Sequence, residues 1–148
     1  MRGSRSPLRL LALASALLLV FTVAGSASGA GGRPFHLELT GEAERPNPGD
    51  PDGTGTASLW LNPGLQRVCW DYTVSGVAPL TAAHIHVGSV DVAGPVVIPT
   101  LPSGPTGGSG CIEAERSLIV EIIRNPENYY FNVHNADFPP GALRAQLG

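Results

Sequence analysis

Short runs in which apolar and polar residues alternate, separated by glycine and proline, most constrain how this chain can fold. Phe35, Leu37 and Leu39 alternate with polar residues, and residues 55–61 and 66–75 repeat the pattern. Neighbouring side chains of a strand point to opposite faces, so each run predicts a strand with one buried face. The chain has 19 glycines and 14 prolines. Short strands separated by such turns are typical of an antiparallel sandwich or barrel.

The turn Asn62-Pro63-Gly64 joins two of these runs and predicts a hairpin. Further strands are predicted at residues 82–87, 95–99, 129–135 and 142–147. We expect residues 102–110, rich in glycine, serine and proline, to be a flexible connection. Residues 117–124 fit either a buried strand or a short amphipathic helix, and the Asn125-Pro126 step ends either one.

Residues 1–30 have the features of an export signal. A leader with three arginines precedes an apolar run at 10–24, and small residues follow at 25–30. This order is typical of a secretory signal peptide. The apolar run is shorter than the roughly 20 residues that span a bilayer, although an uncleaved anchor is an alternative. We therefore expect a secreted, extracellular domain at residues 31–148, with no membrane attachment after cleavage.

The charge of the chain excludes some partners. All nine basic residues are arginine, and removal of the three in the leader takes the formal net charge from −3 to −6. An acidic surface without a basic cluster has nothing to neutralise phosphates, so we expect neither nucleic acid nor an anionic membrane as partner. The expected partner is an extracellular protein or a cell-envelope component. The lack of lysine, with abundant glycine and proline, is typical of a high-GC bacterium.

The chain has two cysteines, Cys69 and Cys111. Export would place them in an oxidising compartment, where a disulfide is the natural expectation. The bridge would close a loop of about 40 residues and stabilise the fold by up to roughly 4 kcal/mol. Two free buried thiols are the alternative, and neither cysteine has a second ligand nearby at zinc-site spacing.

His84 and His86 lie on one predicted strand with a single residue between them. Their side chains leave the same face about 6.5 to 7 Å apart along the backbone, which suits two imidazoles that converge on one ion. If the strand of His134 is a neighbour, the three rings form a ligand set that copper or zinc prefers.

Two alternatives remain for the histidines. Hydrogen bonds could hold them as structural residues beside polar neighbours, namely Asn132, Asn135 and Asp137. A general-base role would need a nucleophile, and the sequence contains no nucleophile elbow and no His-Glu-x-x-His helix. We therefore expect no enzyme activity and no certain cofactor, with copper or zinc as the candidates.

The segments that carry the histidines resemble the two signature segments of the CHRD domain, first named in chordin. The stretch Asp137-Phe138-Pro139-Pro140-Gly141 and the residues that follow are similar to the family pattern Glu-Phe-Pro-Gly-Gly-Ala-Ile-Arg, with Pro140 in place of a usual glycine. The resemblance covers residues 35–147. It implies an extracellular all-β domain, an antiparallel Greek-key or immunoglobulin-like β-sandwich with one short helix before the penultimate strand. It also implies a non-enzymatic binding or structural module.

The His-x-His strand and the later Val133-His134 pair are also similar to copper-zinc superoxide dismutase, a Greek-key sandwich. The chain has no bridging histidine and no evident zinc loop, because His36 is the only other histidine. This likeness implies a metal-binding protein without dismutase activity.

Three further residues are candidates for structural or binding roles. Asn132 and Asp137 lie close to the histidines in sequence, and Arg144 is on the last predicted strand. We expect Arg144 to form a structural ion pair with Asp137 or Glu121, with contact to a ligand as the alternative. Most of the aromatic side chains are expected to fill the core.

Overall fold

The computed structural model describes residues 31–100 and 104–148, so the predicted signal peptide lies outside the described residues. The strands are β1 (Arg33–Thr40), β2 (Thr54–Asn62), β3 (Arg67–Ser75), β4 (Leu80–Val87), β5 (Val96–Pro99), β6 (Gly107–Glu113), β7 (Tyr129–Asn135) and β8 (Leu143–Gln146). The helix α1 (Arg116–Arg124) and a 3-10 turn, η1 (Pro126–Asn128), precede β7. No helix among these residues is long and apolar enough to cross a membrane.

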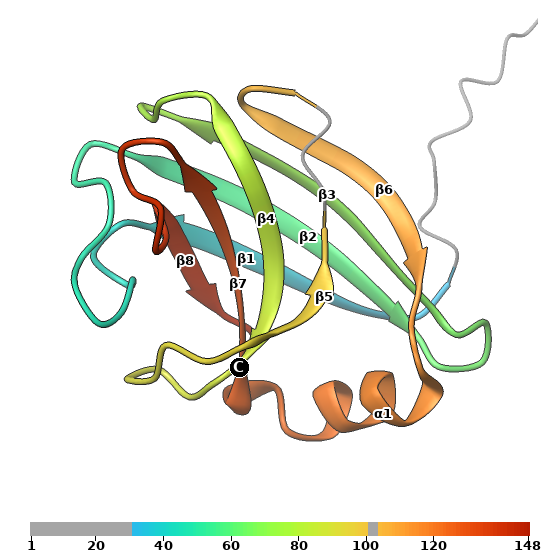
Figure 1. Cartoon of the computed structure of the whole chain (residues 1–148). Helices are drawn as coiled ribbons and strands as arrows, with labels where there is room; N and C mark the ends of the chain where they lie inside the picture. Colours follow the sequence, from blue (N-terminus) through green and yellow to red (C-terminus); the bar gives the residue numbers. More distant parts are fainter. Residues whose placement is uncertain (1–30, 101–103) are drawn as a thin grey trace, which may run out of the picture.

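All eight strands belong to one antiparallel sheet with the order β5-β4-β7-β8-β1-β2-β3-β6. The sheet curls, so that β4, β5 and β7 lie opposite β2, β3 and β6 (Figure 1). The expected all-β antiparallel fold, with one short helix before the penultimate strand, is confirmed. The two layers of the predicted sandwich are joined at one side by the pairing of β8 with β1, where Thr40 faces Arg144.

The apolar side chains expected from the alternation fill the space inside the curl. Phe35, Leu37 and Leu39 of β1 are buried, and so are Leu59 and Leu61 of β2. From the opposite half come core residues of β4, β7 and β8, namely Ala83, Ile85, Phe131, Val133, Leu143 and Ala145. Burial of this apolar surface is the main favourable term in folding.

Strand β7 differs from the others because all seven of its residues are buried. Tyr129, Phe131 and Val133 belong to the core cluster, so the alternate residues point to the other face of the sheet. That face carries polar side chains, and the loops at 41–53, 88–95 and 136–142 contact it through Glu44, Gly94 and Pro139. The polar residues of β7 are therefore enclosed between sheet and loops.

The ambiguous segment before β7 is the helix α1, as the family resemblance implied. Ile119 and Ile122 are fully buried on one side of the helix, which lies across one end of the curled sheet (Figure 1). Asn125 follows the last helical residue, and its Nδ2 donates to Glu121 Oε1 at 2.8 Å. The helix thus joins the two halves of the sheet at that end.

One expectation is wrong. Residues 107–110 were expected to belong to a flexible connection, yet they form the first half of β6, which pairs with β3. Backbone hydrogen bonds to β3 hold this strand, and such bonds require no particular side chain. Glycine also fits the close approach of Trp70, because a Cβ at Gly110 would lie 3.0 Å from the indole ring.

The expected disulfide between Cys69 and Cys111 is confirmed. The two residues are direct partners across β3 and β6, with their Cα atoms 4.0 Å apart. The bridge holds the glycine-rich edge strand β6 against the sheet. It also links residues separated by 42 positions in the sequence, so it lowers the conformational entropy of the unfolded chain.

We expect the Cys69→Ala, Cys111→Ala double variant to lose about 2 to 4 kcal/mol of unfolding free energy, because the unfolded chain regains loop entropy. Chemical denaturation followed by tryptophan fluorescence measures the loss. The parent protein under reductant serves as control and should unfold at the midpoint of the double variant. An unchanged midpoint in both samples would contradict the stabilising role of the bridge.

Candidate metal centre

The polar face of β4, β7 and β8 is organised in rows by the strand register. His84 lies opposite Asn132, which lies opposite Arg144. In the adjacent row, His86 lies opposite Tyr130. Because side chains at directly opposite positions point to the same face, these residues form one continuous polar layer.

The structure brings the three predicted histidines together. One ring nitrogen of each of His84, His86 and His134 lies within 4.8 Å of the corresponding nitrogens of the other two. The shortest contact joins His84 Nδ1 and His134 Nε2 at 3.1 Å. His86 and His134 are 7% and 9% exposed, whereas His84 is half-buried. The cluster is therefore enclosed on the side of His86 and His134 and more open at His84.

Backbone carbonyls determine which nitrogens carry protons. His86 Nδ1 lies 2.8 Å from the carbonyl oxygen of Gly94, and His134 Nδ1 lies 3.0 Å from that of Pro139. A carbonyl oxygen only accepts, so both Nδ1 atoms donate, and in the neutral rings both Nε2 atoms carry lone pairs. His86 Nε2 is buried and has no hydrogen-bond partner in the described part of the chain.

All three imidazoles are held in the neutral form. Burial, with the neighbouring rings of His134 and His86, lowers the pKa of His84 to about 4. Burial also lowers the pKa of His86 and of His134, although the carbonyls of Gly94 and Pro139 favour the charged forms. Neutral imidazole is the form that binds metal ions.

A buried carboxylate supports the centre of the layer. Glu44, in the loop at 41–53, is 2% exposed, and its Oε1 accepts a hydrogen bond from Asn132 Nδ2 at 3.2 Å. Gly141 leaves room for it, because a Cβ at this position, where φ is +157°, would collide with the Glu44 carboxylate. Desolvation raises the pKa of Glu44, while the Asn132 hydrogen bond lowers it.

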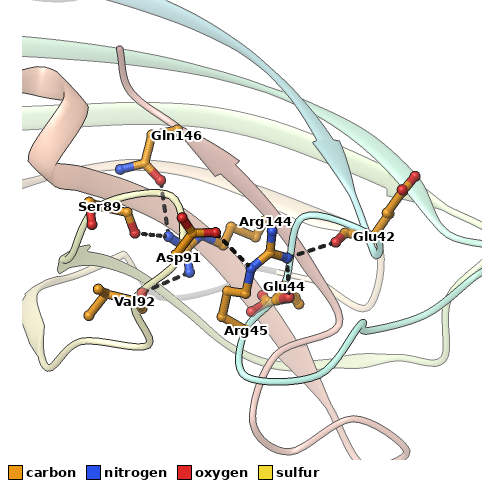
Figure 2. A network of polar contacts seen from close by, with 8 residues as sticks. All are labelled: Glu42, Glu44, Arg45, Ser89, Asp91, Val92, Arg144 and Gln146. Carbon is orange, nitrogen blue, oxygen red and sulfur yellow. Dashed lines mark hydrogen bonds and ion pairs between the residues drawn. The ribbon is translucent and has the colours of Figure 1, made fainter.

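Arg144 ties the loop at 88–95 to the sheet. Its guanidinium donates to the carbonyl oxygens of Ser89 at 2.8 Å and Val92 at 3.0 Å, and to Gln146 Oε1 at 3.0 Å (Figure 2). The side chain is 1% exposed, and its Cζ lies 3.5 Å from the centre of the Tyr130 ring.

The expected ion pair of Arg144 with Asp137 or Glu121 is wrong, because neither carboxylate forms a salt bridge with it in the described residues. Loop carbonyls take their place. The ion pair that joins the covering loops is instead Arg45 with Asp91, at 3.7 Å between Nε and Oδ1 (Figure 2). The Asp91 side chain is 82% exposed, so this pair contributes little to stability.

Tyr130 links Arg144 to the histidines. The rings of His86 and Tyr130 stack with centroids 4.7 Å apart and planes 10° from parallel. His86 comes from β4 and Arg144 from β8, on opposite sides of β7, so the phenol lies between imidazole and guanidinium. The charge of Arg144 is one of the factors that lower the pKa of His86.

Of the polar neighbours expected to hold the histidines in a structural role, only Asn132 contacts one of the rings. His134 Nε2 lies 3.1 Å from Asn132 Oδ1, but the described residues give no hydrogen bond from any of the three rings to Asn135 or Asp137. Asn135 Oδ1 instead accepts from the backbone N–H of Phe138 at 2.8 Å and holds the turn after β7. Asp137 is exposed in that turn.

The sequence interpretation missed several groups that touch the cluster. Glu44, the carbonyl oxygens of Gly94 and Pro139, and the Tyr130 ring all belong to the site. Two of these contacts are made by backbone atoms, which leave no residue-type signal. Glu44 is separated from Asn132 by 88 positions, and nothing in the sequence pattern marks it as buried.

Comparison with known proteins agrees with this architecture. A family model described as the CHRD domain matches residues 35–147. The chain belongs to the CHRD domain family. No curated protein and no solved structure matches it. The family assignment made from the histidine strand and the C-terminal segment is thus confirmed. It places His84, His86 and His134 all within the matched part of the CHRD domain.

The lowered histidine pKa values predict how the metal-free CHRD domain responds to acid. Imidazoles of the unfolded chain titrate near pH 6.5, so between about pH 6.5 and 4 the unfolded state binds more protons than the folded state. Above pH 6.5 the imidazoles are neutral in both states, and their burial costs no unfolding free energy. As the pH drops from 6.5 toward 4, the unfolding free energy should fall, because only the unfolded chain takes up the protons. Urea denaturation across this range measures it.

Histidine NMR resonances give the site-specific check, with the urea-unfolded chain as control. His84 should titrate with a pKa of about 4 in the folded protein. An ordinary titration of His84 near pH 6.5 would show that the ring is not held in the enclosed cluster.

Replacing Arg144 should destabilise the CHRD domain. The Arg144→Met variant keeps the length of the side chain but leaves the Ser89 and Val92 carbonyls without their donor, at a cost of about 2 to 4 kcal/mol. Arg144→Lys keeps a charge without the planar fork and should lie between this variant and the parent. Thermal and urea unfolding measure the difference, and a parent-like Arg144→Met variant would refute the bracing role.

Proposed function

We propose that this CHRD domain is a non-enzymatic, secreted binding module that holds one copper or zinc ion between His84, His86 and His134. Family membership supports a binding or structural module. The disulfide supports an oxidising compartment outside the cytoplasm. The proposal differs from a purely structural role for the histidines in that it assigns them a ligand.

One observation carries the proposal: the buried His86 Nε2 has a lone pair, and residues 31–100 and 104–148 offer it no donor. An unpaired buried polar atom is costly, and each such atom in a native protein calls for an explanation. A metal ion bound by Nε2 would supply the missing partner.

The three ring nitrogens lie within 4.8 Å of one another, and the pair from His84 and His134 already has the spacing of two metal ligands. Two ligands on a tetrahedral zinc ion with bonds of roughly 2.1 Å are about 3.4 Å apart, close to the 3.1 Å between His84 Nδ1 and His134 Nε2. The hydrogen bonds of His86 and His134 to backbone carbonyls are the outer contacts that orient metal-binding imidazoles. The Nδ1 proton of His84 would move to Nε2 when Nδ1 binds the ion. Imidazole donors suit both zinc and copper.

A second candidate function is contact with an extracellular protein or cell-envelope component, with the histidines purely structural. The loop at 88–95 favours it, since Val90 and Val92 are 54% and 47% exposed. Such a module would bind its partner equally well with or without copper or zinc.

Titration calorimetry of the mature CHRD domain without a histidine tag tests the metal proposal. We expect stoichiometric, sub-micromolar binding of Zn(II) or Cu(II), and its loss in the His84→Ala, His86→Ala double variant. His36→Ala is the matched control, because His36 is exposed on β1 and hydrogen-bonded to Ser58 at 3.0 Å. Equal heats for parent and double variant would refute the proposal and favour the second candidate.

A further inference from the structure

Asn132 occupies the centre of the polar layer. It is 1% exposed and lies between His84 on β4 and Arg144 on β8. Its side chain therefore faces the histidine cluster, although asparagine is not among the ligands that the histidine pattern predicts.

Glu44 sets the orientation of the Asn132 amide. Asn132 Nδ2 donates to Glu44 Oε1 at 3.2 Å, and this leaves Oδ1 directed at His134 Nε2, 3.1 Å away. The carboxylate is itself buried against Gly141 and has little freedom to move.

Two acceptors consequently face one another. His134 Nε2 carries a lone pair, because its Nδ1 donates to the Pro139 carbonyl oxygen. In this tautomer His134 Nε2 does not donate, so at 3.1 Å it faces Asn132 Oδ1 as a second acceptor. His84 Nδ1–H can satisfy the nitrogen at 3.1 Å, but not the amide oxygen as well. A buried contact between two acceptors is unfavourable, and a positive ion beside both would relieve it.

We propose that Asn132 Oδ1 is a fourth protein ligand of the ion, held in place by Glu44 as a positioning residue. This inference rests on the metal-binding function proposed above. It adds an amide oxygen to three imidazole nitrogens, a donor set that favours the divalent ions Zn(II) and Cu(II) over the softer Cu(I). Four protein ligands also close the coordination sphere of a tetrahedral ion, as in sites that hold an ion without catalysis.

The test compares Asn132→Leu and Asn132→Asp with the parent CHRD domain. Asn132→Leu keeps the volume but removes the donor, so Zn(II) binding measured by calorimetry should weaken at least about tenfold. In the Cu(II)-loaded variant, paramagnetic resonance in deuterated water should detect an additional bound water. Asn132→Asp supplies a charged oxygen and should bind Zn(II) more tightly than the parent. Tyr129→Phe, also in β7 but on its apolar face and 6% exposed, is the control and should bind like the parent.

The positioning role of Glu44 has its own readout. Glu44→Leu should weaken Zn(II) binding about tenfold and admit the same additional water. Glu44→Gln should restore the parent behaviour, because its amide oxygen accepts the Asn132 hydrogen bond. If Glu44 had only a structural role, Glu44→Leu would lower the stability without changing the water bound to Cu(II).

The outcomes separate the two proposals. If the parent binds and the double histidine variant does not, but Asn132→Leu matches the parent in affinity and bound water, the fourth-ligand inference is overturned and the three-histidine site stands. If Asn132→Leu fails to fold, the Asn132→Asp variant decides: a Zn(II) affinity equal to that of the parent would overturn the fourth-ligand inference. If the parent binds neither Zn(II) nor Cu(II), the proposed function fails, and the inference fails with it.

Discussion

The burial of β7 on both faces is the constraint on which the rest of this structure depends. One face meets the apolar interior, whereas the other carries Tyr130, Asn132 and His134 into a polar layer under the loops. Polar groups that leave water must find partners within the protein. The loops supply them through the Gly94 and Pro139 carbonyls and the Glu44 carboxylate. The loops that cover the sheet are thus bound to it by hydrogen bonds.

This arrangement links the candidate site to the stability of the fold. Arg144 braces the loop at 88–95 and stacks on Tyr130, and Tyr130 stacks in turn on His86. The same loop provides the carbonyl that orients His86. The ring nitrogens are therefore placed by contacts from strands and loops together, a preorganisation that metal sites require. The layer leaves the rings neutral, with lone pairs available to an ion.

The sequence predicted those features that depend on local pattern or on residue type. Alternation located the strands, the His84 and His86 spacing placed two rings on one face, and two cysteines predicted one bridge. The β6 strand was missed, because glycines within it carry no alternation and pairing with β3 alone defines it. The partners of Arg144 were wrong, because they are carbonyl oxygens of a loop more than 50 positions away. Glu44 gave no signal, since its burial arises only when the loop at 41–53 folds over β7.

The histidine tautomers test the central claim most directly. Nitrogen-detected NMR of the metal-free CHRD domain at neutral pH distinguishes a protonated Nδ1 from a protonated Nε2 in each ring. We predict that His86 and His134 both carry their proton on Nδ1, so that two Nε2 lone pairs face the cluster. A proton on Nε2 of either ring would fill the space assigned to the ion and contradict the account.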